Sequence, residues 1–114
     1  MEANELGLRL LLKEELQSAL IQYRFRKWLE SKPEETIVGF CGSVSSCPIA
    51  IYLKEHDYHS VIVEAFAASV LDNFNERVSI DLPSWSMRFI DSVDTFGHFK
   101  RINAKQALLL LKEI

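Results

Sequence analysis

The chain has 114 residues, of which 48% are hydrophobic and 25% are charged, and its formal net charge is −3. This apolar content is too high for a disordered chain, and four glycines with three prolines leave no room for a long flexible linker. We therefore expect one hydrophobic core in a single domain spanning 1–114. The negative charge argues against a general nucleic-acid coat, which needs a surplus of Lys and Arg.

The charge is distributed unevenly along the chain. The middle, 33–96, carries a net −7, whereas 22–32 and 97–114 each carry a net +3. If the basic segments 22–32 and 97–112 meet in the fold, they form a cationic surface. Weak nucleic-acid binding is therefore one alternative function, although the overall charge argues against it.

The ends and the uncharged stretches indicate a cytoplasmic protein. The first ten residues, MEANELGLRL, include acids and lack a small-residue cleavage site, so we expect no secretory signal. The longest uncharged stretch, 36–53, contains two glycines and Pro48, which makes it a poor bilayer helix. Two cysteines, Cys41 and Cys47, are too few for a disulfide-stapled fold, and a reducing cytosol keeps them as thiols.

The first predicted element is a long helix over 5–30, within an N-terminal segment 1–32 that Pro33 closes. One apolar stripe recurs at spacings of three and four residues: Leu8, Leu12, Leu16, Ala19, Leu20 and Tyr23. A second apolar line lies on the opposite side: Leu10, Ile21, Phe25 and Trp28. Two apolar faces indicate a helix covered on both sides, either within the domain or by a second copy of the chain.

The body, 33–114, begins with a loop or brief strand over 36–42. A short helix follows over 48–56, since a serine is available as its cap and Pro48 fits its first turn. β-Branched residues favour strands at 60–66 and 68–72, although a four-residue repeat leaves a helix over 60–74 open.

The next predicted strand covers 77–82, after a turn over 72–75. Its alternating Val78, Ile80 and Leu82 indicate one buried face.

Two helices close the chain. Pro83 opens the first, which Gly97 ends, and Asn103 caps the second in a capping-box pattern with Gln106. The predicted fold is therefore α+β: a long N-terminal helix, a short central helix, a small antiparallel sheet and two C-terminal helices.

The loop that contains Cys41 and Cys47, which we call the cysteine loop, is the first candidate for a catalytic or binding site. Cys47 is expected at a helix N-terminus, which favours a thiolate, and His59 or His56 is a conceivable base for it. The loop 39–46 could also hold an anion or small ligand, although it lacks a Walker pattern. The plainer alternative is that both cysteines fill space in the core.

Two other groups of residues are weaker candidates for a functional site. Cys41, Cys47, His56 and His59 have spacings outside the usual zinc ranges. Asp91 and Asp94 share a helix face with His98 beyond it, which is a possible acid–base pair or simply a solvated face.

The segment 23–28, YRFRKW, interleaves aromatic and basic residues. This is typical of single-strand binding, of a packed helix with cations at its rim, or of a protein contact. Because the chain as a whole is negative, we favour packing.

Several short patterns resemble a group of small bacterial and phage proteins that have no assigned activity. They are Ser46-Cys47-Pro48-Ile49-Ala50, Leu82-Pro83-x-Trp85, Phe89 with Val93-Asp94, and Ala107-Leu108-x-Leu110-Leu111. The resemblance covers 40–114 and implies a bacterial or phage origin. It carries over no catalytic residue and no mechanism.

The sequence therefore predicts a non-enzymatic protein without a cofactor, which binds another protein, most simply a second copy of itself. Leu10, Ile21, Phe25 and Trp28 are the predicted contact residues. A thiol-dependent or small-ligand activity at the loop between Cys41 and Cys47 is the alternative.

Overall fold

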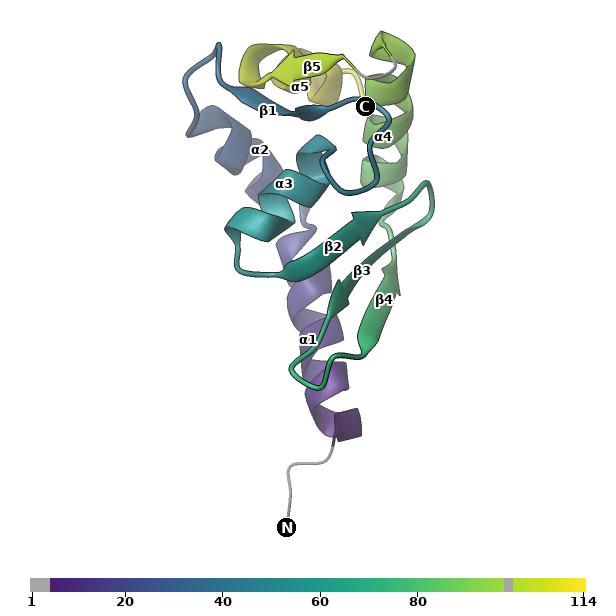
Figure 1. Cartoon of the computed structure of the whole chain (residues 1–114). Helices are drawn as coiled ribbons and strands as arrows, with labels where there is room; N and C mark the ends of the chain where they lie inside the picture. The colour runs from purple at the N-terminus through teal and green to yellow at the C-terminus, as the bar shows by residue number, and fades with distance from the viewer. Residues whose placement is uncertain (1–4, 98–99) are drawn as a thin grey trace.

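The computed structural model describes residues 5–97 and 100–114, and within them it shows an α+β fold. The helices are α1 (Glu5–Ala19), α2 (Gln22–Glu30), α3 (Pro48–Glu55), α4 (Ser84–Phe96) and α5 (Ala104–Lys112). The strands are β1 (Ile37–Phe40), β2 (His59–Val63), β3 (Ala67–Leu71), β4 (Arg77–Asp81) and β5 (Arg101–Asn103). Figure 1 shows α2, α4 and α5 gathered at one end of the molecule and the N-terminal part of α1 at the other.

The N-terminal segment is not the single helix over 5–30 that the apolar periodicity predicts. The helix is interrupted after Ala19, and Ile21 has extended backbone angles of φ −83° and ψ 127°. No Pro or Gly lies between residues 8 and 32, so nothing in the local sequence breaks the helix.

The cause of the interruption lies in the rest of the fold. A break leaves backbone carbonyls without their usual helical partners, and here two core aromatics replace them. The Tyr52 hydroxyl of α3 donates to the carbonyl of Ala19 at 2.5 Å, and the Trp85 indole of α4 donates to that of Leu20 at 3.0 Å. The chain therefore turns at this point because tertiary contacts satisfy its carbonyls there.

The strands form two antiparallel sheets within the described residues. The three strands expected after residue 59 are confirmed and pair in the order β2-β3-β4. The expected turn is also present, since the Asp72 carboxylate accepts hydrogen bonds from the backbone N–H groups of Phe74 and Glu76. The sequence did not predict β5, which pairs with β1 to form the second sheet.

Local signals place the remaining helices correctly. Pro48 is in the first turn of α3, but Cys47 rather than a serine holds the N-cap position. Gly97 ends α4, and Asn103 and Gln106 form the expected capping box on α5.

The core is richest in aromatic rings where α2, α3 and α4 meet. Phe25 lies at its centre, with ring centroids between 5.1 and 5.8 Å from those of Trp28, Tyr52, Trp85 and Phe89. The alternation predicted for β4 also holds, because Val78, Ile80 and Leu82 are all buried. The aromatic cluster around Phe25 joins both halves of the chain into one core.

Candidate functional site

The cysteine loop does not provide an activated thiol. Cys47 is buried, and this burial raises the pKa of its thiol to about 11, against the lowering expected at a helix N-terminus. Burial and the nearby Asp94 carboxylate also raise the pKa of Cys41. The expectation of a thiolate at Cys47 is therefore wrong, and both cysteines are core residues.

The loop before α3 is also too compact for a small ligand. At Gly39, a Cβ atom would lie 2.6 Å from the backbone nitrogen of Pro48, so only glycine permits this approach of β1 to α3. Of two cavities beside Cys47, the one closed by α4 holds about 10 Å³ and the one lined by Gly42 and Val44 holds about 80 Å³, both far smaller than ordinary small-molecule sites. The Gly42 N–H, which could have faced an anion, already donates to the Asp94 carboxylate at 3.0 Å.

The other sequence candidates are not assembled into a site. Asp94 bonds Gly42 while Asp91 is exposed, and His98 lies outside the described residues. Within 5–97 and 100–114, no group of three or more His, Cys, Asp or Glu residues could hold a metal ion, so Cys41, Cys47, His56 and His59 do not form one. Instead, His56 bonds the backbone of α3 and His59 is an exposed residue of β2.

The predicted contact line on the N-terminal helix is split by the helix break. Phe25 and Trp28 are buried in the core of the same chain, so their predicted role as an exposed contact surface is wrong. Leu10 and Ile21 do remain exposed. Because the break reorients α2, the two halves no longer present one continuous face.

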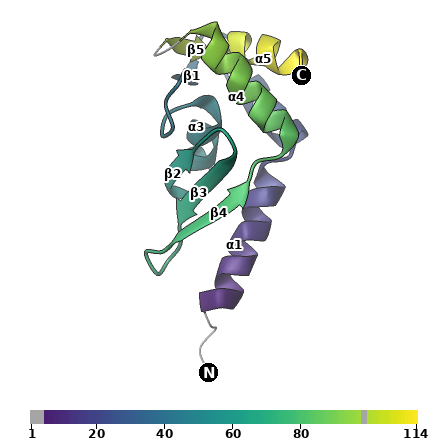
Figure 2. The same cartoon turned by 90° about the vertical axis from the view of Figure 1, so that its right-hand side faces the viewer.

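The first turns of α1 carry a different and denser apolar surface. Four of their leucines are exposed, and we call them the leucine segment: Leu6, Leu8, Leu10 and Leu11. They point to several sides of the helix, while burial of α1 begins only at Leu16. Figure 2 shows this part of α1 extending away from α4 and α5, beside the three-stranded sheet.

A broad groove runs between α1, α2 and α3, with a volume of about 690 Å³. Its lining includes four aromatic side chains, Tyr23, Trp28, Tyr52 and Tyr58. A volume of this size matches that of small-molecule sites in proteins, which are also mostly apolar. The groove is therefore a candidate binding site.

Charged groups line the same groove. α2 contributes Arg24 and Lys27, and α1 contributes Glu15. Burial and the Glu15 carboxylate raise the pKa of the Tyr58 hydroxyl. Burial also raises the pKa of the Tyr52 hydroxyl, and the positive charge of Arg24 partly offsets that rise. The positive charges therefore lie toward α2 and the negative charge lies toward α1.

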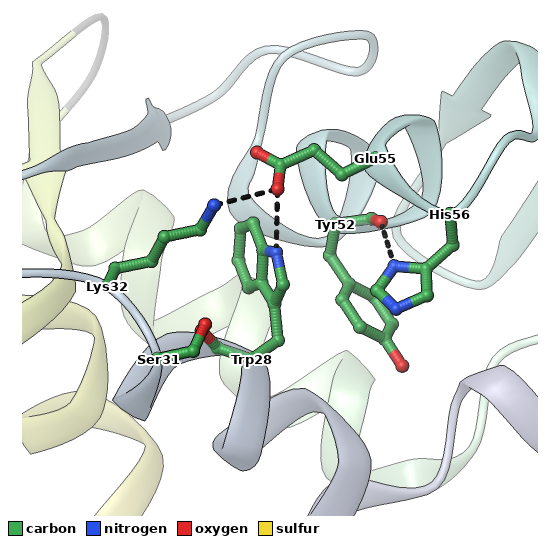
Figure 3. A network of polar contacts seen from close by, with 6 residues as sticks. All are labelled: Trp28, Ser31, Lys32, Tyr52, Glu55 and His56. Atoms are coloured by element: carbon green, nitrogen blue, oxygen red, sulfur yellow. Dashed lines mark hydrogen bonds and ion pairs between the residues drawn. The ribbon is translucent and has the colours of Figure 1, made fainter.

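A polar network fixes the wall that α2 and α3 form (Figure 3). One Glu55 oxygen accepts hydrogen bonds from Lys32 at 2.8 Å and from the Trp28 indole at 3.0 Å. Burial alone would raise the pKa of Glu55, but these two hydrogen bonds outweigh it and lower that pKa below its ordinary value. The network holds the Trp28 ring in place at the edge of the groove.

His56 is oriented by its own helix. Its Nδ1 lies 2.8 Å from the backbone carbonyl of Tyr52, and its ring packs on that of Tyr52 with centroids 4.5 Å apart (Figure 3). Because a carbonyl oxygen only accepts, Nδ1 is the donor in this contact. The His56 ring is thus held in one orientation in the groove lining.

Sequence reasoning found only half of this groove. The segment 23–28 was singled out for its aromatic and basic residues, and the packing interpretation is confirmed for Phe25 and Trp28. Tyr23 instead is exposed, with Arg26 and Lys27 over its ring. The partners from α3 were missed because only a clustering of Tyr52, His56 and Tyr58 at spacings of two and four residues hints at a common surface.

The two basic segments do come together, because α2 packs against α5. No helix in the described ranges has both the length and the apolar character needed to cross a bilayer. Comparison of the chain with known proteins found no matching family, no similar curated protein and no similar solved structure. The argument for function therefore rests on the surfaces described above.

Proposed function

We propose that this chain is a non-enzymatic interaction domain that forms a homo-oligomer through α1. The observation that carries the proposal is the leucine segment, in which Leu6 is 67% exposed and Leu10 is 53% exposed. Exposed large apolar side chains gathered on one segment mark an interaction surface, so the exposure of the leucine segment in a single chain points to a covering partner. The proposal includes a cytoplasmic location, which the two free cysteines of the sequence favour.

A second copy of the chain suits this surface for two reasons. Two identical apolar helix faces are complementary to each other across a two-fold axis, which is the commonest symmetry of soluble oligomers. The leucine segment is also followed by exposed residues of both charges, Lys13, Glu14 and Glu15, so the lysine of one copy can face an acid of the other at this edge.

The expected affinity is modest. Burying the exposed half of a leucine side chain contributes about 1 kcal/mol, so four leucines contribute about 4 kcal/mol per copy. Association itself costs on the order of 4–15 kcal/mol. The net gain for two copies is then at most about 4 kcal/mol, which corresponds to a Kd of about 1 mM. Self-association is therefore expected only at high concentration, and measurements must extend to at least several hundred micromolar.

Sedimentation velocity across this concentration range tests the proposal. The natural chain is expected to shift from monomer to dimer or higher oligomer as concentration rises, whereas Leu10→Lys is expected to stay monomeric. The matched control is Leu109→Lys on α5, because Leu109 is also 53% exposed but lies outside the leucine segment. A natural chain that sediments as a clean monomer at high micromolar concentration would refute self-association, and equal effects of the two variants would remove α1 as its site.

Nucleic-acid binding is a second candidate, which the packing of α2 against α5 favours. This packing places the basic segments 22–32 and 97–112 on neighbouring elements. Gel shift with single- and double-stranded probes at about 50 mM salt tests it, because electrostatic binding is strongest at low salt. No shift under these conditions eliminates this candidate.

A further inference from the structure

The groove between α1, α2 and α3 contains none of the four leucines, although Glu15, His56 and Tyr58 also line the neighbouring pocket that includes Leu8 and Leu11. Its aromatic lining has a buried floor and accessible walls. Trp28 and Tyr52 are buried, whereas Tyr23 is 56% exposed and Tyr58 is half-buried. Because Arg26 and Lys27 lie over the Tyr23 ring, Tyr58 is the wall on which a ring would stack. Stacking of a base on one aromatic side chain contributes about 1–3 kcal/mol.

The charges of the groove favour an anion on its α2 side. Arg24 is exposed and takes part in no ion pair among the described residues, and Lys27 has only a long, exposed pair with Glu30 at 3.6 Å. Glu15 is the one acid in the lining, on the α1 side. A guanidinium close to an ammonium is a typical receptor for a phosphate or a carboxylate.

The opposite side of the groove suits a polar ring edge rather than a second anion. The Glu15 carboxylate on this side accepts hydrogen bonds. Ring amines and ring N–H groups are donors of the matching kind.

We propose that this groove binds a planar aromatic ring that carries an anionic group, as in a nucleoside monophosphate. The ring stacks on Tyr58, and its anionic group faces Arg24 and Lys27. A free nucleotide and the phosphorylated 5′ end of a strand share this chemistry.

Isothermal titration calorimetry with four probes separates the two parts of the proposal. AMP is expected to bind, and adenosine and inorganic phosphate are each expected to bind at least tenfold more weakly. Phosphate binding as tightly as AMP would overturn the role of the ring, and no heat with AMP at millimolar concentration would overturn the site. A 5′-phosphorylated dinucleotide that binds more tightly than AMP identifies a strand end as the source, and equal binding identifies a free nucleotide; both support the proposal.

Two variants locate the binding. Arg24→Gln is expected to weaken the binding of AMP at least tenfold and to leave the weak binding of adenosine unchanged. Arg88→Gln is the control, since Arg88 is an exposed arginine of α4 that does not line the groove. Circular dichroism establishes that both variants are folded. Equal losses in the two variants would show attraction to general positive charge and would overturn the proposal.

Discussion

Two apolar regions of the N-terminal thirty residues differ in burial: one is packed in the core and the other is exposed. Around Phe25, four aromatic rings close a buried cluster, and the hydroxyl and indole groups nearby all have partners. In the leucine segment, four large side chains are exposed on a helix that the rest of the chain covers only farther along. The buried Phe25 lies between Arg24 and Arg26, whereas the exposed segment is mostly leucine, so partners elsewhere in the fold rather than local hydrophobicity decide which region becomes core.

The largest expected difference between the regions is in stability. Phe25→Ala is expected to lower the free energy of unfolding by about 3–5 kcal/mol, because it opens a cavity among aromatic rings. Leu10→Ala is expected to change it by less than about 0.5 kcal/mol in the monomer, because Leu10 is exposed. Urea denaturation at low micromolar protein measures both. A large loss for Leu10→Ala would mean that the leucine segment already belongs to the folded core.

Thiol reactivity sharpens the same contrast within the packed region. With the pKa of Cys47 raised from 9.0 to about 11, the thiolate fraction at neutral pH is about a hundredfold lower than for an ordinary cysteine. Iodoacetamide labelling followed by mass spectrometry is expected to be at least that much slower in the folded protein than in urea. Leu10→Ala should leave the rate unchanged. Rapid labelling of native Cys47 would restore the thiol hypothesis.

Removing a hydrogen bond at the helix break is expected to lower stability by an intermediate amount. Tyr52→Phe removes the donor to the Ala19 carbonyl and is expected to cost about 1–3 kcal/mol, since a buried acceptor is left unpaired. Tyr23→Phe is the matched control, because Tyr23 is exposed. Thermal and urea unfolding measure both variants. Equal stability of Tyr52→Phe and the natural chain would show that the break does not need this bond.

The smallest expected effect concerns the contact between α1 and the β3–β4 turn, where Arg9 pairs with Asp72 at 3.2 Å. Burial raises the pKa of Asp72, but the N–H groups of Glu76 and Phe74 and the Arg9 guanidinium outweigh it and lower that pKa below 3.8. A lowered carboxyl pKa stabilises the fold above the unfolded value, and this stabilisation is lost as pH falls through the folded value.

Melting curves between pH 5 and pH 2 test this dependence. Asp72→Asn is expected to melt lower than the natural chain at pH 5 and to fall less steeply below about pH 3.8. The control is Asp91→Asn, an exposed acid on α4. Parallel curves for the natural chain and Asp72→Asn would contradict the assigned role of this carboxylate.

The parts of the fold that the sequence predicted are those with local causes. Pro48 begins α3 and Gly97 ends α4 because of their own backbone preferences, and Asn103 with Gln106 forms a cap within one turn of α5. By contrast, β5 has three residues, too few for an alternating pattern, and it exists because β1 pairs with it. The groove was missed for the same reason, since it joins Glu15 to Tyr58 across three helices.

The interruption between α1 and α2 also has a consequence for the order in which the chain folds. Residues 8–32 alone favour one unbroken helix, because they contain no helix breaker. The donors that satisfy the broken turn come from 33 and 65 residues further along the chain. The native bend therefore forms only after α3 and α4 have docked, so early in folding the N-terminal segment is a straight rod that must later give up part of its own helical bonding.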